Sequence, residues 1–183
     1  LWTYVISPSV CGFAAATYMR GIRFVNIPTT LLAMVDASSG GKTGIDYNGI
    51  KNGIGTFTQP LATLIHPNFL RTLPATELLS GFAEMLKHAL IASPEEWIRL
   101  LQLAQEELPQ AQFVAALSER GLLHNSIAIK EKVVAEDPRE AGMRKILNFG
   151  HTIGHAIEST MLHHTTPSYT TLHYASHGYC VLW

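Results

Sequence analysis

Apolar side chains at positions 78, 79, 82, 85, 86, 89 and 90 recur at the spacing of one face of an α-helix. The pattern predicts a helix that begins near residue 74. Pro74 suits its first turn, where the missing N–H costs nothing, and Glu77 is favourable beside the positive end of the helix dipole.

Two further helices are expected after this one. The segment Ser93-Pro94-Glu95-Glu96 has the form of a capping box, which predicts a second helix that stops near Pro109. A third helix is expected from about residue 112 to residue 136, with Gly121 as its weak point. Asp137-Pro138 then breaks it, because the residue before a proline is pushed out of helical geometry.

The first seventy residues show shorter apolar runs separated by glycine, proline and polar residues. Strand, helix and strand in alternation favour a parallel α/β layer. The expected elements are a strand over 1–7, a helix over 12–20 that Gly21 stops, a strand over 24–27, one or two helical turns over 31–35, a polar glycine-rich loop over 36–52 and a strand over 62–65. Residues 159–176 are expected to form a loop.

The change in pattern near Leu73 predicts two parts. Residues 1–73 form an α/β portion and residues 74–183 form an all-helical portion, with a cleft between them. The chain starts without Met and stops at Trp183 within an apolar pattern, so a longer parent protein is expected.

Composition narrows the function classes. The chain has 47% hydrophobic and 15% charged residues and a formal net charge of −1, and no basic block is present, which gives no support for nucleic-acid or membrane-surface binding. No apolar run is long enough to predict a transmembrane helix. Two isolated cysteines, Cys11 and Cys180, suggest a reducing compartment such as the cytoplasm.

His151 and His155 are spaced so that a helix would place them on one face, one turn apart. Asn148 and Arg144 fall on the same stripe of such a helix. A catalytic zinc usually takes three protein ligands, so a metal site would need a third residue from elsewhere. Thr152 occupies the position that holds glutamate in His-Glu-x-x-His proteases, which argues against that class. An ordinary amphipathic helix with two histidines remains the alternative.

Glu84 and Lys87 are spaced for an ion pair on a helix surface, which is the usual meaning of such a pair. Glu84 also follows Gly81-Phe82-Ala83 in an apolar stretch, where a carboxylate needs a partner, and a metal ion held by His151 would provide one. His177 opens another apolar run and is a candidate third ligand, although alone it is more often an ordinary histidine.

The segment 36–44 contains Gly-Lys-Thr, but a P-loop requires glycine where Asp36 stands. A looser interpretation is an anion site in which glycine N–H groups approach the ligand and Lys42 and Lys51 supply charge. The alternative is a solvated loop with incidental lysines. Lys130, Arg144 and Lys145 are expected to be exposed by default. They become candidate site residues only if the ligand is anionic.

Taken together, these motifs resemble those of the 3-dehydroquinate synthases, in the sugar-phosphate cyclase family. The matching segments occur in the family's order and cover nearly all of residues 10–159. They are GFAAATYMRGIRFVNIPTTLLAMVDASSGGKTGID, GIKNGIGTFTQP, TLPATELLSGFAEMLKHALI, KEKVVAEDPREAGMRKILNFGHTIGHAIES and, more weakly, HGYCV.

The resemblance implies the C-terminal part of a Rossmann-like NAD-binding α/β domain over 1–73 and an all-α metal- and substrate-binding domain over 74–183. It implies NAD and a divalent metal as cofactors, with zinc as the expected ion and cobalt as the alternative. The implied reaction is that of a lyase, which converts 3-deoxy-D-arabino-heptulosonate 7-phosphate to 3-dehydroquinate and phosphate in the shikimate pathway of aromatic amino acid biosynthesis.

The resemblance also implies roles for individual residues. The metal ligands would be Glu84, His151 and His177, with His163, His164 or His173 as alternatives to the last. The catalytic and substrate-binding residues would be Asp36, Lys42, Lys87, Lys130, Arg144, Asn148 and His155. The NAD contacts would be Thr29, Thr30, Leu32, Asp36, Lys42, Lys51, Asn52, Thr72 and Glu77.

Partners and alternatives follow from the same resemblance. The expected ligand is a small sugar phosphate, and the expected compartment is cytoplasmic. A homodimer is a further possibility, in which Arg20 would reach a phosphate across the subunit contact. Another sugar-phosphate cyclase, of the 2-deoxy-scyllo-inosose synthase kind, is the first alternative. A glycerol-dehydrogenase-like oxidoreductase and a catalytically inactive metal-binding fragment are the others.

Overall fold

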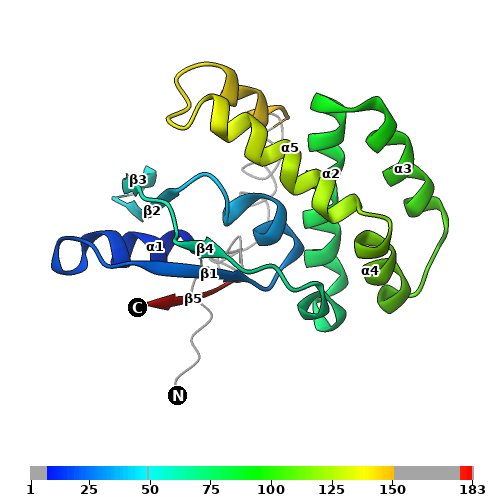
Figure 1. The fold of residues 1–183 in the computed structure, drawn as a ribbon, viewed down its shortest axis with the longest axis horizontal. Helices are drawn as coiled ribbons and strands as arrows, with labels where there is room; N and C mark the ends of the chain where they lie inside the picture. Colours follow the sequence, from blue (N-terminus) through cyan, green and yellow to red (C-terminus); the bar gives the residue numbers. More distant parts are fainter. Residues whose placement is uncertain (1–7, 49, 151–177, 183) are drawn as a thin grey trace, which may run out of the picture.

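The structure, a computed structural model, describes residues 8–48, 50–150 and 178–182 (Figure 1). Its strands are β1 (Phe24–Pro28), β2 (Lys42–Tyr47), β3 (Ile50–Phe57), β4 (Ala62–Thr63) and β5 (Gly178–Leu182). Its α-helices are α1 (Pro8–Thr17), α2 (Ala75–Ala92), α3 (Pro94–Gln105), α4 (Gln110–Glu119) and α5 (Leu122–Glu136). Short helical turns are η1 (Tyr18–Arg20), η2 (Ala33–Ala37), η3 (Pro67–Thr72) and η4 (Met143–Asn148).

A small sheet with strand order β4–β1–β5 forms one side of the molecule, with α1 beside it, and α2 to α5 gather on the other side (Figure 1). β1 pairs in parallel with β4, where Val25 lies opposite Ala62, and antiparallel with β5, where Val25 lies opposite Val181. The parallel pair beside a helix confirms the predicted α/β portion. The expectation that residues 74–183 are all helical is wrong for residues 178–182, which form β5 in this sheet. β4 is shorter than the predicted strand over 62–65.

The helix expected over 12–20 begins earlier, at Pro8, and passes into η1 after Thr17. Gly21 ends it with a φ of 111°, a conformation that favours glycine, so the predicted stop is confirmed. The helical turns expected over 31–35 are present as η2, a π-helix in which the Ser38 N–H donates to the Ala33 carbonyl at 3.0 Å.

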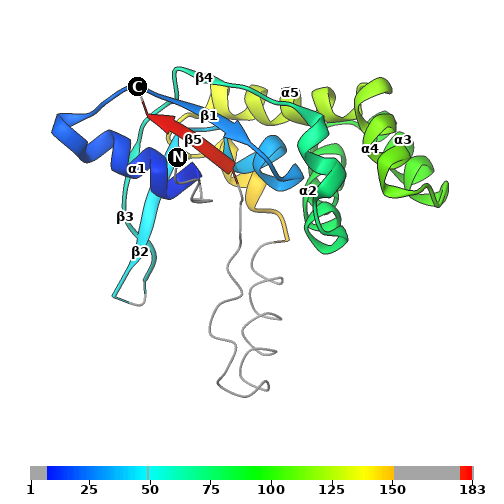
Figure 2. The ribbon, with the colours of Figure 1, turned by 90° about the horizontal axis from the view of Figure 1, so that it is seen from below.

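The glycine-rich loop expected over 36–52 is wrong, because β2 and β3 form an antiparallel hairpin there (Figure 2). Thr43 lies opposite Thr56, and Gly44 lies opposite Gly55. A Cβ on Gly55 would lie 2.3 Å from the Thr43 carbonyl oxygen, so the strands approach too closely for a side chain at that position. Gly44, a glycine within the expected loop, likewise allows close strand approach, since a Cβ there would lie 3.0 Å from the Ile54 carbonyl oxygen.

α2 follows the predicted period and buries Leu78, Phe82, Met85 and Ala89. Pro74 is its N-cap residue, and Glu77 lies in its first turn. The predicted start of α3 is also confirmed, since the Ser93 Oγ accepts the Glu96 N–H at 3.3 Å.

The single helix expected over 112–136 is wrong, because α4 and α5 are separate helices. Gly121, the predicted weak point, has a φ of 71° and interrupts helical geometry between them. α5 ends at Glu136, before Asp137, as predicted.

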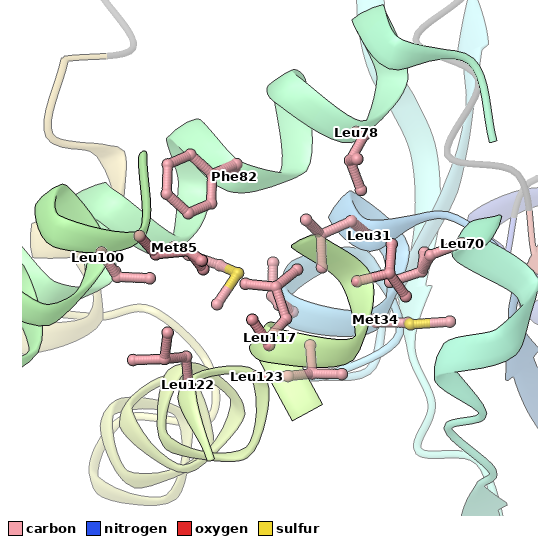
Figure 3. Close-up of a cluster of buried hydrophobic side chains, with 14 of the residues drawn as sticks. Leu31, Met34, Leu70, Leu78, Phe82, Met85, Leu100, Leu117, Leu122 and Leu123 are labelled. Carbon is pink, nitrogen blue, oxygen red and sulfur yellow. The ribbon is translucent and has the colours of Figure 1, made fainter. Parts of the chain in front are cut away.

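One continuous apolar core joins η2 to α2, α3, α4 and α5 (Figure 3). Leu31 and Met34, which flank and enter η2, belong to this core, and η2 contacts α2 and α5. Its large members include Leu31, Met34, Leu70, Leu78, Phe82, Met85, Leu100, Leu117, Leu122 and Leu123. This packing fixes η2, and therefore Asp36, against the helices that carry the other candidate site residues.

Arg144 and Asn148 do not continue into a helix with His151, contrary to the predicted stripe. They lie in η4, after which Phe149 is extended, with a ψ of 127°, and Gly150 has a φ of 80°. The helix expected around His151 and His155, the strand expected over 1–7 and the loop expected over 159–176 lie outside the described residues. Within the described ranges, no helix is both long and apolar enough to cross a bilayer.

Candidate functional site

A cleft of about 680 Å³ opens between the β2–β3 hairpin, η2, α2, α5 and η4. It brings together six of the predicted catalytic residues, although they are far apart along the chain. They are Asp36, Lys42, Lys87, Lys130, Arg144 and Asn148. The cleft therefore has a strongly cationic lining with a single carboxylate from η2 among the predicted residues.

Lys130 of α5 is buried, and its Nζ donates a hydrogen bond to Asp36 Oδ1 at the end of η2. Burial raises the pKa of the Asp36 carboxyl, but the charge and hydrogen bond of Lys130, with Lys87 and His88, together lower it below its usual value. Asp36 is thus an ionised carboxylate at neutral pH. Lys130, expected to be exposed by default, is instead fixed by this pair inside the cleft.

Arg144 is also buried, and its guanidinium is held by two backbone carbonyls. Nη1 donates to Gly40 at 3.2 Å and to Pro138 at 2.8 Å. Gly40 has a φ of 98°, and a Cβ there would lie 2.2 Å from Arg144 Nη2, so the glycine is needed for this contact. Burial lowers the pKa of Arg144, against the opposing effect of Asp36 and Asp137, and the guanidinium stays charged at neutral pH.

The side chain of Asp137 shapes the connection between α5 and η4, which leads to Arg144, by accepting backbone N–H groups; it is called the Asp137 cap below. Asp137 accepts the N–H groups of Ala141 at 2.9 Å, Gly142 at 2.7 Å and Arg144 at 3.1 Å. These backbone hydrogen bonds lower the pKa of the Asp137 carboxyl. The cap turns the chain sharply after α5, which returns Arg144 to the cleft that Lys130 already lines.

The predicted ion pair of Glu84 and Lys87 is present, but it is nearly buried and does not lie on the helix surface. The side chains of Glu84 and Lys87 are 12% and 11% exposed, and Glu84 Oε1 lies 2.5 Å from Lys87 Nζ and 3.2 Å from His88 Nε2. Lys87 also donates to the Leu147 carbonyl at 2.6 Å. The other prediction, a nearly buried carboxylate in need of partners, describes this geometry.

The ligand atoms of Asp36, Glu84 and His88 all lie within 4.8 Å of one another, a separation that a single cation can bridge. Within the part of the chain that the structure describes, Glu84 Oε1 and His88 Nε2 are buried and form no hydrogen bond, although they lie 3.2 Å apart. The Lys87 ammonium already lies beside this carboxylate oxygen, whereas the buried imidazole nitrogen is unsatisfied. Two carboxylates and an imidazole are donors that suit a divalent metal, so the set fits such an ion.

The other predicted metal ligands, His151 and His177, lie outside the described residues, as do His155, His163, His164 and His173. The residue after His177, Gly178, begins β5 and pairs with Pro28 at the end of β1. That end of β1 leads into η2, on which Asp36 lies.

Glu140 is a site residue that the sequence analysis missed. Its carboxylate forms an ion pair with Lys42 of β2 and accepts a hydrogen bond from Asn148 Nδ2 at 2.7 Å. Burial, followed by Arg144 and Lys130, lowers the pKa of the Lys42 ammonium, while Asp36 opposes this effect. The only sequence signal for Glu140 is that an acidic residue stands shortly before Arg144, and no periodic pattern marks this position.

Of the predicted NAD contacts, only Asp36, Lys42 and Asn52 are among the described residues that line the cleft. Thr30 is buried at the turn after β1, where its Oγ1 accepts the Ala33 N–H at 3.1 Å. Thr29 and Leu32 flank this turn, Thr72 ends η3 and Glu77 lies in the first turn of α2. Lys51 belongs to β3. An NAD role for these residues stays a prediction.

The chain matches two family models along nearly its whole length. The model described as 3-dehydroquinate synthase N-terminal matches residues 5–80, and the model described as 3-dehydroquinate synthase C-terminal matches residues 81–183. The two matches meet within α2, between Ser80 and Gly81.

Curated relatives carry the same description. The chain is 51% identical over 148 residues to the 3-dehydroquinate synthase of Parabacteroides distasonis, which covers 81% of this chain and 40% of that protein. It is 48% identical over 151 residues to the enzyme of Streptococcus thermophilus, which covers 82% of this chain and 41% of that protein. The chain thus spans about two fifths of the length of these relatives.

Two solved structures share the fold. A 2-epi-5-epi-valiolone synthase from Streptomyces hygroscopicus, with NAD⁺ and Zn²⁺ bound, matches with a TM-score of 0.71 and 32% identity over 85% of this chain and 42% of that one. A 2-deoxy-scyllo-inosose synthase complexed with carbaglucose-6-phosphate, NAD⁺ and Co²⁺ matches with a TM-score of 0.70 and 28% identity over 85% of this chain and 41% of that one.

Proposed function

The chain belongs to the 3-dehydroquinate synthase family, and from this premise we propose that it forms the substrate- and metal-binding part of such an enzyme. The proposed reaction eliminates phosphate from 3-deoxy-D-arabino-heptulosonate 7-phosphate and closes the ring of 3-dehydroquinate. The observation that carries the proposal is the cleft, where four cationic side chains surround a space beside the nearly buried Glu84 carboxylate. These side chains are Lys42, Lys87, Lys130 and Arg144.

The charge of the cleft matches the charge of this substrate, which carries a phosphate and a carboxylate. Arg144 offers a planar, rigidly held guanidinium suited to one of these anions, and lysine ammonium groups suit the other as point charges. The hydrogen bond from Lys130 to Asp36 holds the Lys130 ammonium group in place at the cleft. The chain's own residues therefore bind and orient the substrate, which is most of the task in a reaction with several steps on one molecule.

We propose NAD and a divalent metal, zinc or cobalt, as the cofactors, with Glu84, His151 and His177 as the metal ligands. When bound, NAD accepts and returns a hydride while the cation polarises the reacting hydroxyl as a Lewis acid. His155 would lie near the substrate phosphate and take part in proton transfer. The residues after β1, with Asn52 of β3, would contact NAD.

We further propose that residues 1–73 contribute to the NAD-binding portion and residues 74–183 to the metal-binding portion of a cytoplasmic homodimer. Arg20, which is exposed at the end of η1 and is not among the described residues that line the cleft, would reach a phosphate across this dimer. Sedimentation equilibrium of the purified protein tests the dimer. A concentration-independent monomer would contradict it.

The function is tested by inorganic phosphate release from 3-deoxy-D-arabino-heptulosonate 7-phosphate, with NAD and Zn²⁺ present, in the purified protein. We expect phosphate release with no accumulation of NADH. Arg144→Ala should remove at least one charge-assisted contact and lower the rate by about 10- to 100-fold or more. Lys145→Ala, an exposed neighbour on η4, is the matched control and should behave as wild type.

The matching cyclase structures favour a second candidate, a sugar-phosphate cyclase that acts on a different substrate. A panel that includes glucose 6-phosphate separates the candidates, because only the dehydroquinate reaction must engage a substrate carboxylate. Net NADH production would instead indicate an oxidoreductase. Metal binding without turnover of any substrate would indicate a non-catalytic fragment.

A further inference from the structure

His88 is a fully buried imidazole that the proposed reaction does not use. It follows Glu84 by one helical turn on α2, and side chains on a helix lean toward its N-terminus, so the ring leans toward the Glu84 carboxylate. Its Nε2 lies 3.2 Å from Glu84 Oε1. On the opposite side of the ring, Nδ1 lies 2.9 Å from the Oγ of Ser126, a buried residue of α5.

Two contacts hold this ring between α5 and α2. His88 Nδ1 and the Ser126 hydroxyl share a hydrogen bond, and the tautomer of the ring decides which of them donates. On the other ring nitrogen, Nε2 lies in close contact with Glu84 Oε1, without a hydrogen bond between them. Ser126, His88 and Glu84 therefore form a continuous series of contacts that crosses from α5 to α2.

Lys87 competes for the same carboxylate oxygen. Its Nζ lies 2.5 Å from Glu84 Oε1, and it also donates to the Leu147 carbonyl of η4. A metal that takes this oxygen of Glu84 as a ligand must displace the ammonium group from it. The ring of His88 contacts the same oxygen and is fixed by Ser126, so it restrains Glu84 during this exchange.

We propose that His88, held by Ser126, is a positioning residue that orients the Glu84 carboxylate for metal binding. The inference rests on the proposed function, because it takes Glu84 as a metal ligand. Residues that orient a metal ligand from outside the coordination sphere typically change metal affinity by about 10- to 100-fold when they are removed.

The test is Co²⁺ titration of the full chain, followed by its visible absorption bands and by calorimetry. His88→Phe keeps a buried ring without the two ring nitrogens and should weaken Co²⁺ binding by about 10- to 100-fold. His88→Gln places an amide N–H near the position of Nε2 and should recover most of that affinity. Ser126→Ala should weaken binding less than His88→Phe, and the double variant should bind no more weakly than His88→Phe alone, since Ser126 acts through His88.

Each outcome separates this inference from the proposed function. If the wild-type chain and Glu84→Ala bind Co²⁺ equally, Glu84 is not a ligand and both fail. If Glu84→Ala loses the metal while His88→Phe and Ser126→Ala bind as wild type, the positioning role fails and the metal site stands. If His88→Gln binds as weakly as His88→Phe, with shifted bands, His88 is itself a ligand and the inference is overturned. If His88→Phe does not fold, Ser126→Ala and His88→Gln decide.

Discussion

The close approach of α2 to the turn before η2 gives a prediction that can be worked from distances. Gly81 is buried on α2. A Cβ added there would lie 2.5 Å from Leu31 Cβ, 2.5 Å from the Leu32 backbone nitrogen and 2.7 Å from Leu31 Cγ. Real Cβ contacts are almost never shorter than 3.0 Å, so Gly81→Ala forces one element to move.

Two opposing effects set the size of the change. Alanine in place of glycine within a helix stabilises by about 1 kcal/mol. Overpacking a core costs about 1–3 kcal/mol, and the upper end applies here because a backbone nitrogen and the fully buried Leu31 cannot rotate away. We therefore expect Gly81→Ala to lower the free energy of unfolding by about 2 kcal/mol.

Urea unfolding followed by circular dichroism measures this difference as a shift in midpoint at an unchanged slope. The matched control is Ala83→Gly, at an exposed position on the same helix, which should lose about 1 kcal/mol from propensity alone. A Gly81→Ala chain as stable as wild type, or more stable, would refute the close contact between α2 and Leu32.

Three further predictions concern charge and capping. Asp36 has a lowered pKa in the folded state, so its contribution to stability is complete above the unfolded value of about 3.9 and is lost as pH falls through the folded value. Lys130→Met leaves burial to raise that pKa, so acid unfolding, followed by circular dichroism, should begin at higher pH than in wild type; an unchanged acid limb would contradict the pair. Glu140→Gln removes the carboxylate that pairs with Lys42, so calorimetry should detect inorganic phosphate binding roughly fivefold tighter, about 1 kcal/mol, and weaker binding would show that Glu140 does not compete with anions. Ser93→Ala removes the acceptor at the start of α3 and should cost about 1 kcal/mol in urea unfolding, whereas Ser93→Asn should cost much less; equal losses would argue against the cap.

The features that sequence analysis predicted well are local ones. The period of α2 and the cap at Ser93 depend on residues a few positions apart, so the sequence carries them directly. The hairpin was not predicted, because glycine occurs both in loops and where two strands approach closely. Only the pairing of Gly44 with Gly55 shows that the second case applies here. The division into α4 and α5 was not predicted, because the sequence shows that Gly121 weakens a helix but does not show that the chain turns there.

The site depends on contacts that no local pattern encodes. Lys130 and Asp36 are separated by 94 positions, and the resemblance to a family, rather than periodicity, placed them together. His88 and Ser126 are separated by 38 positions, and neither was selected, although the spacing of His88 from Glu84 offered a signal. Family motifs identify residues that touch the ligand more readily than residues that support them.

The Asp137 cap has a consequence for ligand selection. Lys130 is anchored before it and Arg144 after it, so the short connection between them acts as a spacer of fixed length. A ligand with two negative groups meets two cations whose separation is set before it arrives, and it spends little free energy on arranging them. Lengthening this spacer by a residue would retune which pair of anions fits, while leaving the hydrophobic interior untouched.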